Sequence, residues 1–255
     1  MASQTEVRGS SQLQQRGRRV WNSFIDLLFP PRCGGCGAPG SLWCTACRTS
    51  VKPVEPPWCE KCGEPGTPAG LCSRCRAQPL QLDGIRSVAL FQGPLREGIH
   101  RYKYQRLASL AEPFGEMLVE YWRAQQLTAD WLMPVPLHPS RERDRGYNQS
   151  NLLARRLAAG VGVPISASLR RTRATAVQME LNAAQRKNNV AGAFACDDAR
   201  VRGKRIIVVD DVCTTGATLE ACAAALLKAG AVSVMGLTLA RTPYGDDPRT
   251  QGERK

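Results

Sequence analysis

Apolar residues recur with two different periods from Ile85 onward. Short apolar runs alternate with longer segments whose apolar residues lie four positions apart, as Leu110, Phe114 and Leu118 do. Runs of the first kind are typical of buried strands, and segments of the second kind of amphipathic helices. Because strands alternate with helices, we predict an α/β fold with a mainly parallel sheet flanked by helices. The predicted strands are Ile85–Phe91, Trp131–Val135, Ile206–Asp210 and Ser233–Ala240, and the predicted helices are Leu95–Arg106, Leu110–Gln126, Gln149–Ala159 and Thr218–Ala229.

The first third of the chain lacks this pattern. Residues 1–19 are polar and rich in Ser, Gln and Arg, so we expect them to be disordered. Val20, Phe24 and Leu28 follow at helical spacing and predict a short helix. Residues 32–80 are rich in Cys, Gly and Pro but poor in large aliphatic side chains, so something other than hydrophobic burial must hold them. The predicted divisions are a disordered segment 1–19, a helix with a cysteine-rich module 20–80, an α/β domain 81–243 and a disordered tail 244–255.

Eight of the eleven cysteines form two quartets, each made of two C-x-x-C pairs. A reducing compartment disfavours disulfides, and four thiolates are the usual ligands of a closed, structural zinc site. We therefore predict two structural Zn²⁺ ions, most simply one for each quartet, although an exchange of pairs between the quartets would also satisfy the spacing. The predicted ligands are Cys33, Cys36, Cys44 and Cys47 in the first quartet and Cys59, Cys62, Cys72 and Cys75 in the second.

Positive charge is concentrated in one stretch of the chain. The formal net charge is +13, and residues 141–187 hold ten Lys and Arg against three Asp and Glu. This excess indicates either an ordinary solvated surface or a field that attracts pyrophosphate or nucleic acid. Trp43 and Trp58 leave a similar choice, between stacking on nucleic-acid bases and packing the cysteine module. No apolar run approaches the roughly 18 residues that span a bilayer, so we expect a cytoplasmic protein without membrane insertion.

The segment 208–219, VVDDVCTTGATL, carries the strongest chemical signal. An apolar strand delivers two adjacent carboxylates to the sheet edge where ligands of open α/β sheets bind. Such a pair suits the hydroxyls of a ribose, with Mg²⁺ nearby. The glycine that follows permits close approach of the backbone, and the start of a helix offers N–H groups to a phosphate. The predicted phosphoribosyl-binding residues are Asp210, Asp211, Thr214, Thr215, Gly216, Ala217 and Thr218, while Cys213 is expected to be packed in the interior.

This segment resembles the signature of type I phosphoribosyltransferases for 5-phosphoribosyl 1-pyrophosphate (PRPP) almost position by position. The chain from about Trp21 to Arg241 resembles the ComF family, the competence protein F/GntX group. That resemblance implies a double zinc ribbon before a type I phosphoribosyltransferase fold, with Mg²⁺ and PRPP as ligands, and handling of incoming single-stranded DNA during natural transformation. Besides the quartets, it rests on Tyr102-Lys103-Tyr104, Pro134–His138, Arg145–Gln149 and Gln178–Phe194, the last with R-x-x-N at Arg186–Asn189.

The resemblance also gives a role to part of the basic stretch. In the phosphoribosyltransferase fold a loop after the first core strand contacts pyrophosphate, and a mobile loop follows it. Here these would be Leu137–Ser140 and Arg141–Gln149. Arg143 and Arg145 are candidates to hold the pyrophosphate leaving group, since a guanidinium fork fits phosphate oxygens, or else they face solvent. His138 is either an acid–base residue or a structural residue of the loop. The predicted pyrophosphate-binding residues are therefore Leu137, His138, Arg143 and Arg145.

Three functions remain open from the sequence. The first is a PRPP-binding protein that handles single-stranded DNA. The second is an active phosphoribosyltransferase with an unknown nitrogen acceptor, and the third is a non-enzymatic zinc-ribbon protein that docks onto a competence helicase or another protein of the uptake machinery. We favour the first, because segment 208–219 supports binding of PRPP whereas nothing in the sequence specifies an acceptor base.

Overall fold

A computed structural model describes residues 30–68, 70–173, 190 and 192–244 of the protein. The predictions of a disordered segment 1–19, of the short helix after it and of nearly the whole tail 244–255 lie outside the described residues. So does most of the stretch Gln178–Phe194, including its R-x-x-N motif.

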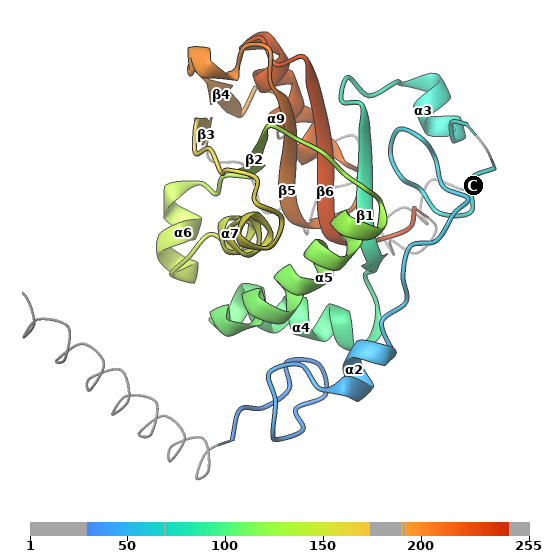
Figure 1. Cartoon of the computed structure of the whole chain (residues 1–255), viewed down its shortest axis with the longest axis vertical. Coiled ribbons are helices and arrows are strands. Elements are labelled where there is room, and N and C mark those ends of the chain that lie inside the picture. The colour runs from blue at the N-terminus through green and yellow to red at the C-terminus, as the bar shows by residue number, and fades with distance from the viewer. Residues whose placement is uncertain (1–29, 69, 174–189, 191, 245–255) are drawn as a thin grey trace, which may run out of the picture.

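Four parallel strands form the main sheet, in the order β1-β6-β5-β2, and two antiparallel strands, β3 and β4, form a small separate sheet. This arrangement confirms the predicted α/β fold (Figure 1). The strands are β1 (Gly84–Leu90), β2 (Trp131–Pro134), β3 (Leu169–Arg171), β4 (Phe194–Cys196), β5 (Arg205–Cys213) and β6 (Ser233–Arg241). The α-helices are α2 (Thr45–Thr49), α3 (Ser73–Ala77), α4 (Gly93–Tyr104), α5 (Ala111–Ala124), α6 (Pro139–Arg145), α7 (Gln149–Val161) and α9 (Ala217–Lys228).

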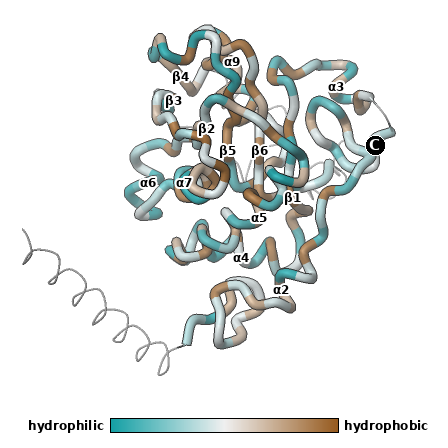
Figure 2. Tube along the Cα trace, in the orientation of Figure 1, coloured by the Kyte–Doolittle hydropathy of each residue, from teal (hydrophilic) through white to brown (hydrophobic). Residues whose placement is uncertain are grey.

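The central strand β5 shows how the sheet is buried on both faces. Successive side chains of a strand point to opposite faces, so Ile207 and Val209 pack with α4, α5 and α7, whereas Ile206 and Val208 pack with α9 and the β3–β4 pair. Apolar residues accordingly follow β5 and β6 in Figure 2. This double burial explains why the strand reads as an unbroken apolar run in the sequence.

Two boundaries differ from the sequence-based prediction. Strand β5 continues to Cys213 instead of ending at Asp210, because its last residues pair with Ala240 and Arg241 of β6. The acidic pair therefore lies within the strand. The segment 141–149, predicted as a loop, is mostly helical: residues 141–145 belong to α6, Gln149 begins α7, and residues 146–148 join the two helices. Helix α6 begins on a proline and ends at a glycine with φ 88°, and both are ordinary boundary residues for a helix.

The two cysteine quartets dock at different places on the α/β domain, as the positions of α2 and α3 in Figure 1 show. The first quartet lies against α4 and α5, where the ring of Trp43 meets Phe114 edge-on with 5.2 Å between centroids. The second lies beside β1, where the guanidinium of Arg86 sits 5.5 Å from the Trp58 ring. Both tryptophans therefore contact the domain, which supports the packing alternative for their role.

One arginine of the α/β domain holds each quartet by the main-chain carbonyl of a cysteine. Arg101 on α4 donates a hydrogen bond to the carbonyl of Cys33 (3.0 Å). Arg241, the last residue of β6, donates to the carbonyl of Cys62 (2.6 Å). The metal-binding module is thus joined to the domain through the backbone of its own predicted ligands.

Arg241 is fully buried and connects the end of β6 to the cysteine module and to the end of β5. Its charge is balanced by Glu64 of the cysteine module, with 2.8 Å between Nη2 and Oε2. Its Nη1 also lies 3.4 Å from the sulfur of Cys213 at the end of β5, and its guanidinium lies 5.3 Å from the centre of the Tyr244 ring. The prediction that Cys213 is packed in the interior is confirmed, since its exposed fraction is 2%.

We expect Arg241→Met to lower the free energy of unfolding by about 3–5 kcal/mol, because it leaves a buried carboxylate without its cation. The matched control is Arg205→Met, whose exposed ion pair with Asp130 (3.3 Å) should be worth less than about 1 kcal/mol. Urea unfolding of the zinc-loaded protein measures both, and zinc content should stay unchanged because no cysteine is altered. Equal losses in the two variants would contradict this account of Arg241.

Candidate functional site

The candidate site lies at the C-terminal edge of β2 and β5, which are neighbours in the sheet. Pro134 pairs with Val209, and the N–H of Val135 donates to the Val209 carbonyl (3.0 Å). The segment 135–138 then leads from β2 into α6, and the segment 214–216 leads from β5 into α9. Topology therefore brings the predicted pyrophosphate segment, the acidic pair and the threonine-rich turn to one edge of the sheet.

The acidic pair is held by two residues from the helices that cover the sheet. Ser150, in the first turn of α7, donates from Oγ to Oδ1 of Asp210 (2.7 Å). Lys103, near the end of α4, places Nζ 2.8 Å from Oδ1 of Asp211. Asp211 is only 3% exposed, and its second carboxylate oxygen has no hydrogen-bond partner among the described residues. A buried acceptor of this kind is costly to leave unpaired, so it fits a site that receives a hydroxyl or a cation.

The charge of Asp211 also affects the protonation of Asp210. Burial and the adjacent charge of Asp211 raise the pKa of Asp210 to about 6, although the hydrogen bond from Ser150 and the charge of Lys103 act in the opposite direction. The folded protein therefore tolerates the ionised pair at neutral pH at a cost in stability. Such concentrated negative charge is favourable only when a ligand or cation compensates for it.

The turn between β5 and α9 has the form of a phosphate cradle. Gly216 is the N-cap of α9 with φ 78°, and a Cβ atom there would lie 2.7 Å from the side chain of Ile85. Glycine is therefore required at this position. Gly216 cannot cap α9 with a side chain, and the start of a helix generally suits an anion. Thr215 is buried, and its Oγ1 accepts the N–H of Ala217 (3.4 Å).

The segment Arg145–Gln149 fixes the start of α7, and thereby Ser150, beside the acidic pair. Asn148 caps α7 with its side-chain oxygen and donates from Nδ2 to the carbonyl of Val135 (3.0 Å). Gln149 accepts the hydroxyl of Tyr102 at its main-chain carbonyl (2.8 Å). Every one of these contacts joins the region between α6 and α7 to β2 or to α4.

The structure assigns different positions to the three catalytic candidates. His138 is the N-cap of α6, where its Nδ1 accepts the N–H of Ser140 (3.3 Å) and contacts Oγ of the same residue (2.7 Å). This geometry supports the structural alternative for His138. Arg145 contacts the side chain of Gln149 and lies over the ring of Tyr104 at 5.5 Å. Arg143 is exposed on α6 and has no ion pair within the described residues, while Leu137 is half-buried.

Two residues of this site were missed in the sequence. Lys103 lies in the Tyr-Lys-Tyr motif that supports the family resemblance, but nothing local to α4 indicates that its charge meets Asp211. Ser150 directly follows the Arg145–Gln149 segment, and its role also depends on tertiary structure. One sequence signal could have pointed to Lys103. It lies inside a recognisable motif and has no acidic residue one helical turn away with which to pair.

The cysteine quartets are well formed for metal. Within each quartet the sulfur atoms all lie within 4.8 Å of one another, and both the Cys36–Cys44 and the Cys62–Cys72 sulfur pairs are 3.7 Å apart. A tetrahedral site with Zn–S bonds of about 2.3 Å needs sulfurs about 3.8 Å apart. The residues therefore fit one zinc ion for each quartet. An exchange of pairs does not fit, because the quartets dock at separate places.

Backbone donors favour the thiolate form of one cysteine in each quartet, whereas burial raises the pKa of Cys47, Cys62 and Cys75. Burial raises the pKa of Cys33 and of Cys59, but main-chain N–H groups, first those of Cys44 and Cys72, outweigh it and lower each pKa to about 6. Thiolate is the form that binds metal. The same arrangement recurs in the two quartets, as expected for a duplicated metal site.

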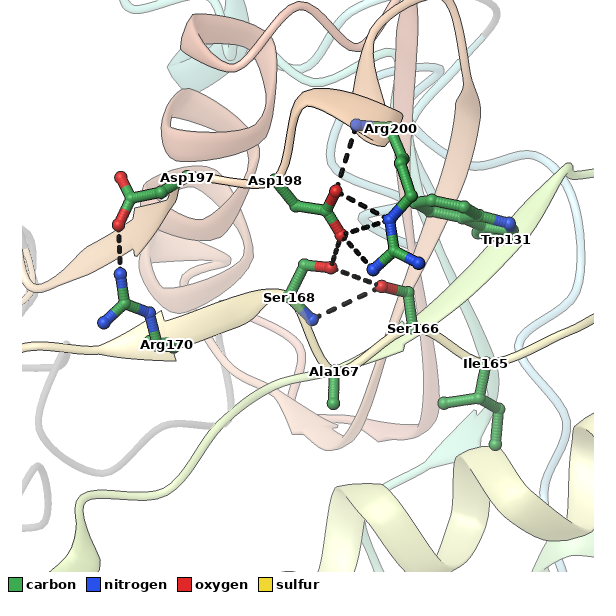
Figure 3. A pocket seen from close by; sticks show the side chains of 9 residues that line it. All are labelled: Trp131, Ile165, Ser166, Ala167, Ser168, Arg170, Asp197, Asp198 and Arg200. Atoms are coloured by element: carbon green, nitrogen blue, oxygen red, sulfur yellow. Dashed lines mark hydrogen bonds and ion pairs between the residues drawn. The ribbon is translucent and has the colours of Figure 1, made fainter.

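A cavity of about 540 Å³ lies away from this edge, beside Trp131 at the start of β2 (Figure 3). Its polar side chains already bond to one another. Ser168 contacts Ser166 (2.6 Å) and the carboxylate of Asp198, which also pairs with Arg200 (2.8 Å). Hydrogen bonds from Arg200 and Ser168 hold the pKa of Asp198 below its usual range. Because these groups are satisfied without a ligand, we place the candidate site at the β2–β5 edge.

Known proteins match both parts of the chain. Residues 24–76 match the family model of a double zinc ribbon domain, and residues 144–253 match that of a phosphoribosyl transferase domain. DNA utilization protein YhgH of Salmonella typhi is 35% identical over 226 residues, which cover 85% of this chain and 99% of that protein. Competence protein F of Haemophilus influenzae is 30% identical over 178 residues, 67% of this chain and 78% of that protein.

Among solved structures, the glutamine PRPP amidotransferase of B. subtilis, complexed with ADP and GMP, covers 51% of this chain and 26% of its own. Its sequence identity is 24% and its TM-score 0.37. No helix within the described ranges is long and apolar enough to cross a membrane.

Two four-cysteine clusters before a parallel sheet with this edge define the class of the protein, a double zinc ribbon joined to a phosphoribosyltransferase-fold domain. The relatives that match most of the chain identify one particular family within this class. The protein belongs to the ComF family of competence protein F, as its sequence motifs predict.

We expect Asp210→Asn to stabilise the ligand-free protein by at most about 3 kcal/mol at pH 7.5, and by about half of that at pH 5. The pKa of Asp210 is about 6 in the folded protein, above the ordinary value of 3.8. Between pH 3.8 and pH 6 the folded state therefore binds more protons than the unfolded state, and the stability of the wild type falls as pH rises through this range. Unfolding by urea at both pH values measures the difference between variant and wild type.

Asp130→Asn is the control for this comparison. The backbone N–H and side chain of Arg205 lower the pKa of Asp130, so the same substitution there should not stabilise the protein. A gain at Asp210 that is equal at the two pH values would show that charge repulsion is not its cause.

Proposed function

We propose that the protein binds Mg²⁺–PRPP at the β2–β5 edge and takes part in the cytoplasmic handling of incoming single-stranded DNA. The observation that carries the first part is the buried acidic pair, with its unpartnered Asp211 oxygen, placed directly before a glycine-capped helix start. Ribose hydroxyls would bind Asp210 and Asp211, with Mg²⁺ nearby, and the 5′-phosphate would bind the turn 214–218.

The pyrophosphate of PRPP would lie toward the segment that follows β2. This segment starts beside β5, and Lys103 already provides a cation next to the acidic pair. Arg145 is close enough to α4 and α7 to form part of the same wall. A phosphoribosyl transfer would need cations at this position, because charge develops on the departing pyrophosphate. The acceptor of such a transfer is left open in this proposal.

We expect Mg²⁺–PRPP to bind the wild type and to bind Asp211→Asn about 10–100-fold more weakly, because a charged acceptor for ribose hydroxyls is lost. The matched control is Asp198→Asn, which makes the same change in the separate cavity beside Trp131 and should leave the affinity unchanged. Isothermal titration calorimetry measures all three proteins. Equal affinity in the wild type and Asp211→Asn would overturn the site assignment.

The calorimetry is followed by an assay for pyrophosphate release from PRPP with nitrogen acceptors. Release that depends on an acceptor would support the alternative of an active phosphoribosyltransferase. Binding of PRPP without release would support a protein that uses the fold for binding alone. A role of the zinc ribbons as a separate docking module has no comparable support, since both are held against the α/β domain by buried contacts.

The DNA-handling part rests on the relatives and on charge. The matched proteins are named for competence and for DNA utilization, and residues 141–187 carry a balance of +7. Within the described part of this stretch, Arg156 and Arg170 pair with acidic side chains. Arg143 is exposed without such a pair, so α6 offers positive charge to a phosphate backbone.

We expect Arg143→Glu to weaken binding of a single-stranded oligonucleotide and to reduce the dependence of its affinity on salt, because a phosphate contact is lost. Arg143→Glu/Arg145→Glu should have a larger effect of the same kind. Arg170→Glu, an exposed position already paired with Asp197, serves as the control. Fluorescence anisotropy at several salt concentrations measures the affinities. Binding that is unchanged in the double variant would remove α6 from the DNA-binding surface.

A further inference from the structure

Tyr104 exposes an aromatic ring at the rim of the candidate site. Its exposed fraction is 53%, and the only other large hydrophobic side chain exposed within the described residues is Val232. Single exposed hydrophobic residues are common and carry little meaning by themselves. The surroundings of Tyr104 distinguish it from Val232.

Two side chains hold the Tyr104 ring in place while much of it stays exposed. His100, one helical turn earlier on α4, lies 4.9 Å from it between ring centroids, at an interplanar angle of 48°. The guanidinium of Arg145, at the end of α6, lies 5.5 Å from its centre. A ring with fixed orientation that is about half exposed can accept another flat group at little cost in conformational entropy.

The seam between α4 and α6 fixes the position of this ring. Arg106 adopts φ 55° just after α4 and donates to the carbonyl of Asp144 at the end of α6 (3.3 Å). The hydroxyl of Tyr147 bonds to the carbonyl of Tyr102. Because both contacts join the end of α4 to the region of α6, the Tyr104 ring has a fixed position relative to both helices.

The two helices that form this seam carry an excess of positive charge, and α4 also reaches the acidic pair. Residues 93–106 and 139–145 hold seven Lys and Arg against three Asp and Glu, namely Glu97, Glu142 and Asp144. Lys103, the residue before the exposed tyrosine, contacts Asp211. A chain of phosphates that follows these cations would therefore pass the aromatic ring and reach the edge of the phosphoribosyl pocket.

We propose that Tyr104, supported by His100 and Arg145, is a stacking platform for a base of single-stranded DNA. Bases stack on aromatic side chains without regard to sequence, and nearby cations bind the phosphates on either side. Bases of a duplex are covered by their neighbours and cannot reach such a ring. The inference rests on the DNA-binding part of the proposed function and adds a particular contact to it.

The chemistry of the rim favours this ligand over an apolar partner. The side chains next to the ring in the chain or in space, Gln105, Arg106, His100 and Arg145, are polar or charged. A protein or membrane partner held by hydrophobic contact would need a contiguous apolar patch. A half-exposed ring close to cations is instead the combination that single-stranded nucleic acids bind.

The test compares two probes of equal length and charge, an oligothymidylate and an oligonucleotide with abasic sites in place of the bases. We expect Tyr104→Ala to weaken binding of the oligothymidylate about tenfold, while its affinity for the abasic probe stays that of the wild type. Tyr104→Phe and Tyr104→Trp should retain binding, because they keep a ring. Val232→Ala, the other exposed hydrophobic position, is the matched control and should bind both probes normally.

Fluorescence anisotropy gives the affinities, while zinc content and thermal unfolding verify that each variant is folded. Equal weakening for both probes, or no weakening in Tyr104→Ala, would overturn the platform. Nucleoside monophosphates serve as a third probe. If Tyr104→Ala weakens the binding of these alone, the platform is also overturned, and the result would indicate a site for small molecules instead. If the wild type binds neither probe, the DNA part of the proposed function fails as well. If Arg143→Glu weakens binding but Tyr104→Ala does not, only this inference fails.

Discussion

The buried guanidinium of Arg241 holds the metal-binding module, the central sheet and the turn toward α9 in one arrangement. A full charge in the interior is tolerable only when its hydrogen bonds and its counter-charge are all in place. Here these come from Cys62 and Glu64 of the cysteine module and from Cys213 at the end of β5. The second zinc ribbon is therefore packed against the domain and is not a separate module on a flexible linker.

A second consequence concerns the candidate site itself. In each ribbon an arginine of the domain donates to the carbonyl of a predicted zinc ligand, and each of these arginines belongs to an element that also reaches the site. Helix α4 carries Arg101 to the first ribbon and Lys103 to the acidic pair. Arg241 reaches the second ribbon and the residue that ends β5, just before the turn 214–216. The two ribbons thus support opposite sides of an edge where two carboxylates are kept close together against their mutual repulsion.

Much of this could be predicted from the sequence, because the signals are local. Cysteine spacing defines the ribbons, and an apolar run followed by acids, threonines and Gly216 defines the edge. The rest depends on tertiary contacts. Strand β5 gains its last residues by pairing with β6, and the partner of Asp211 comes from a distant helix. Helix α6 has no buried residue, so no apolar period marks it, and only Pro139 and Gly146 indicate its ends.

The long separation between Arg241 and its partners sets an order of assembly during synthesis. Arg101 follows Cys33 by 68 residues, whereas Arg241 follows Cys62 by 179. At about 5–20 residues per second, the second ribbon would wait roughly 10–35 s for its anchor after leaving the ribosome. Zinc can fill that ribbon during the wait, because its four cysteines are close in sequence. The last strand can then close the domain over the ribbon.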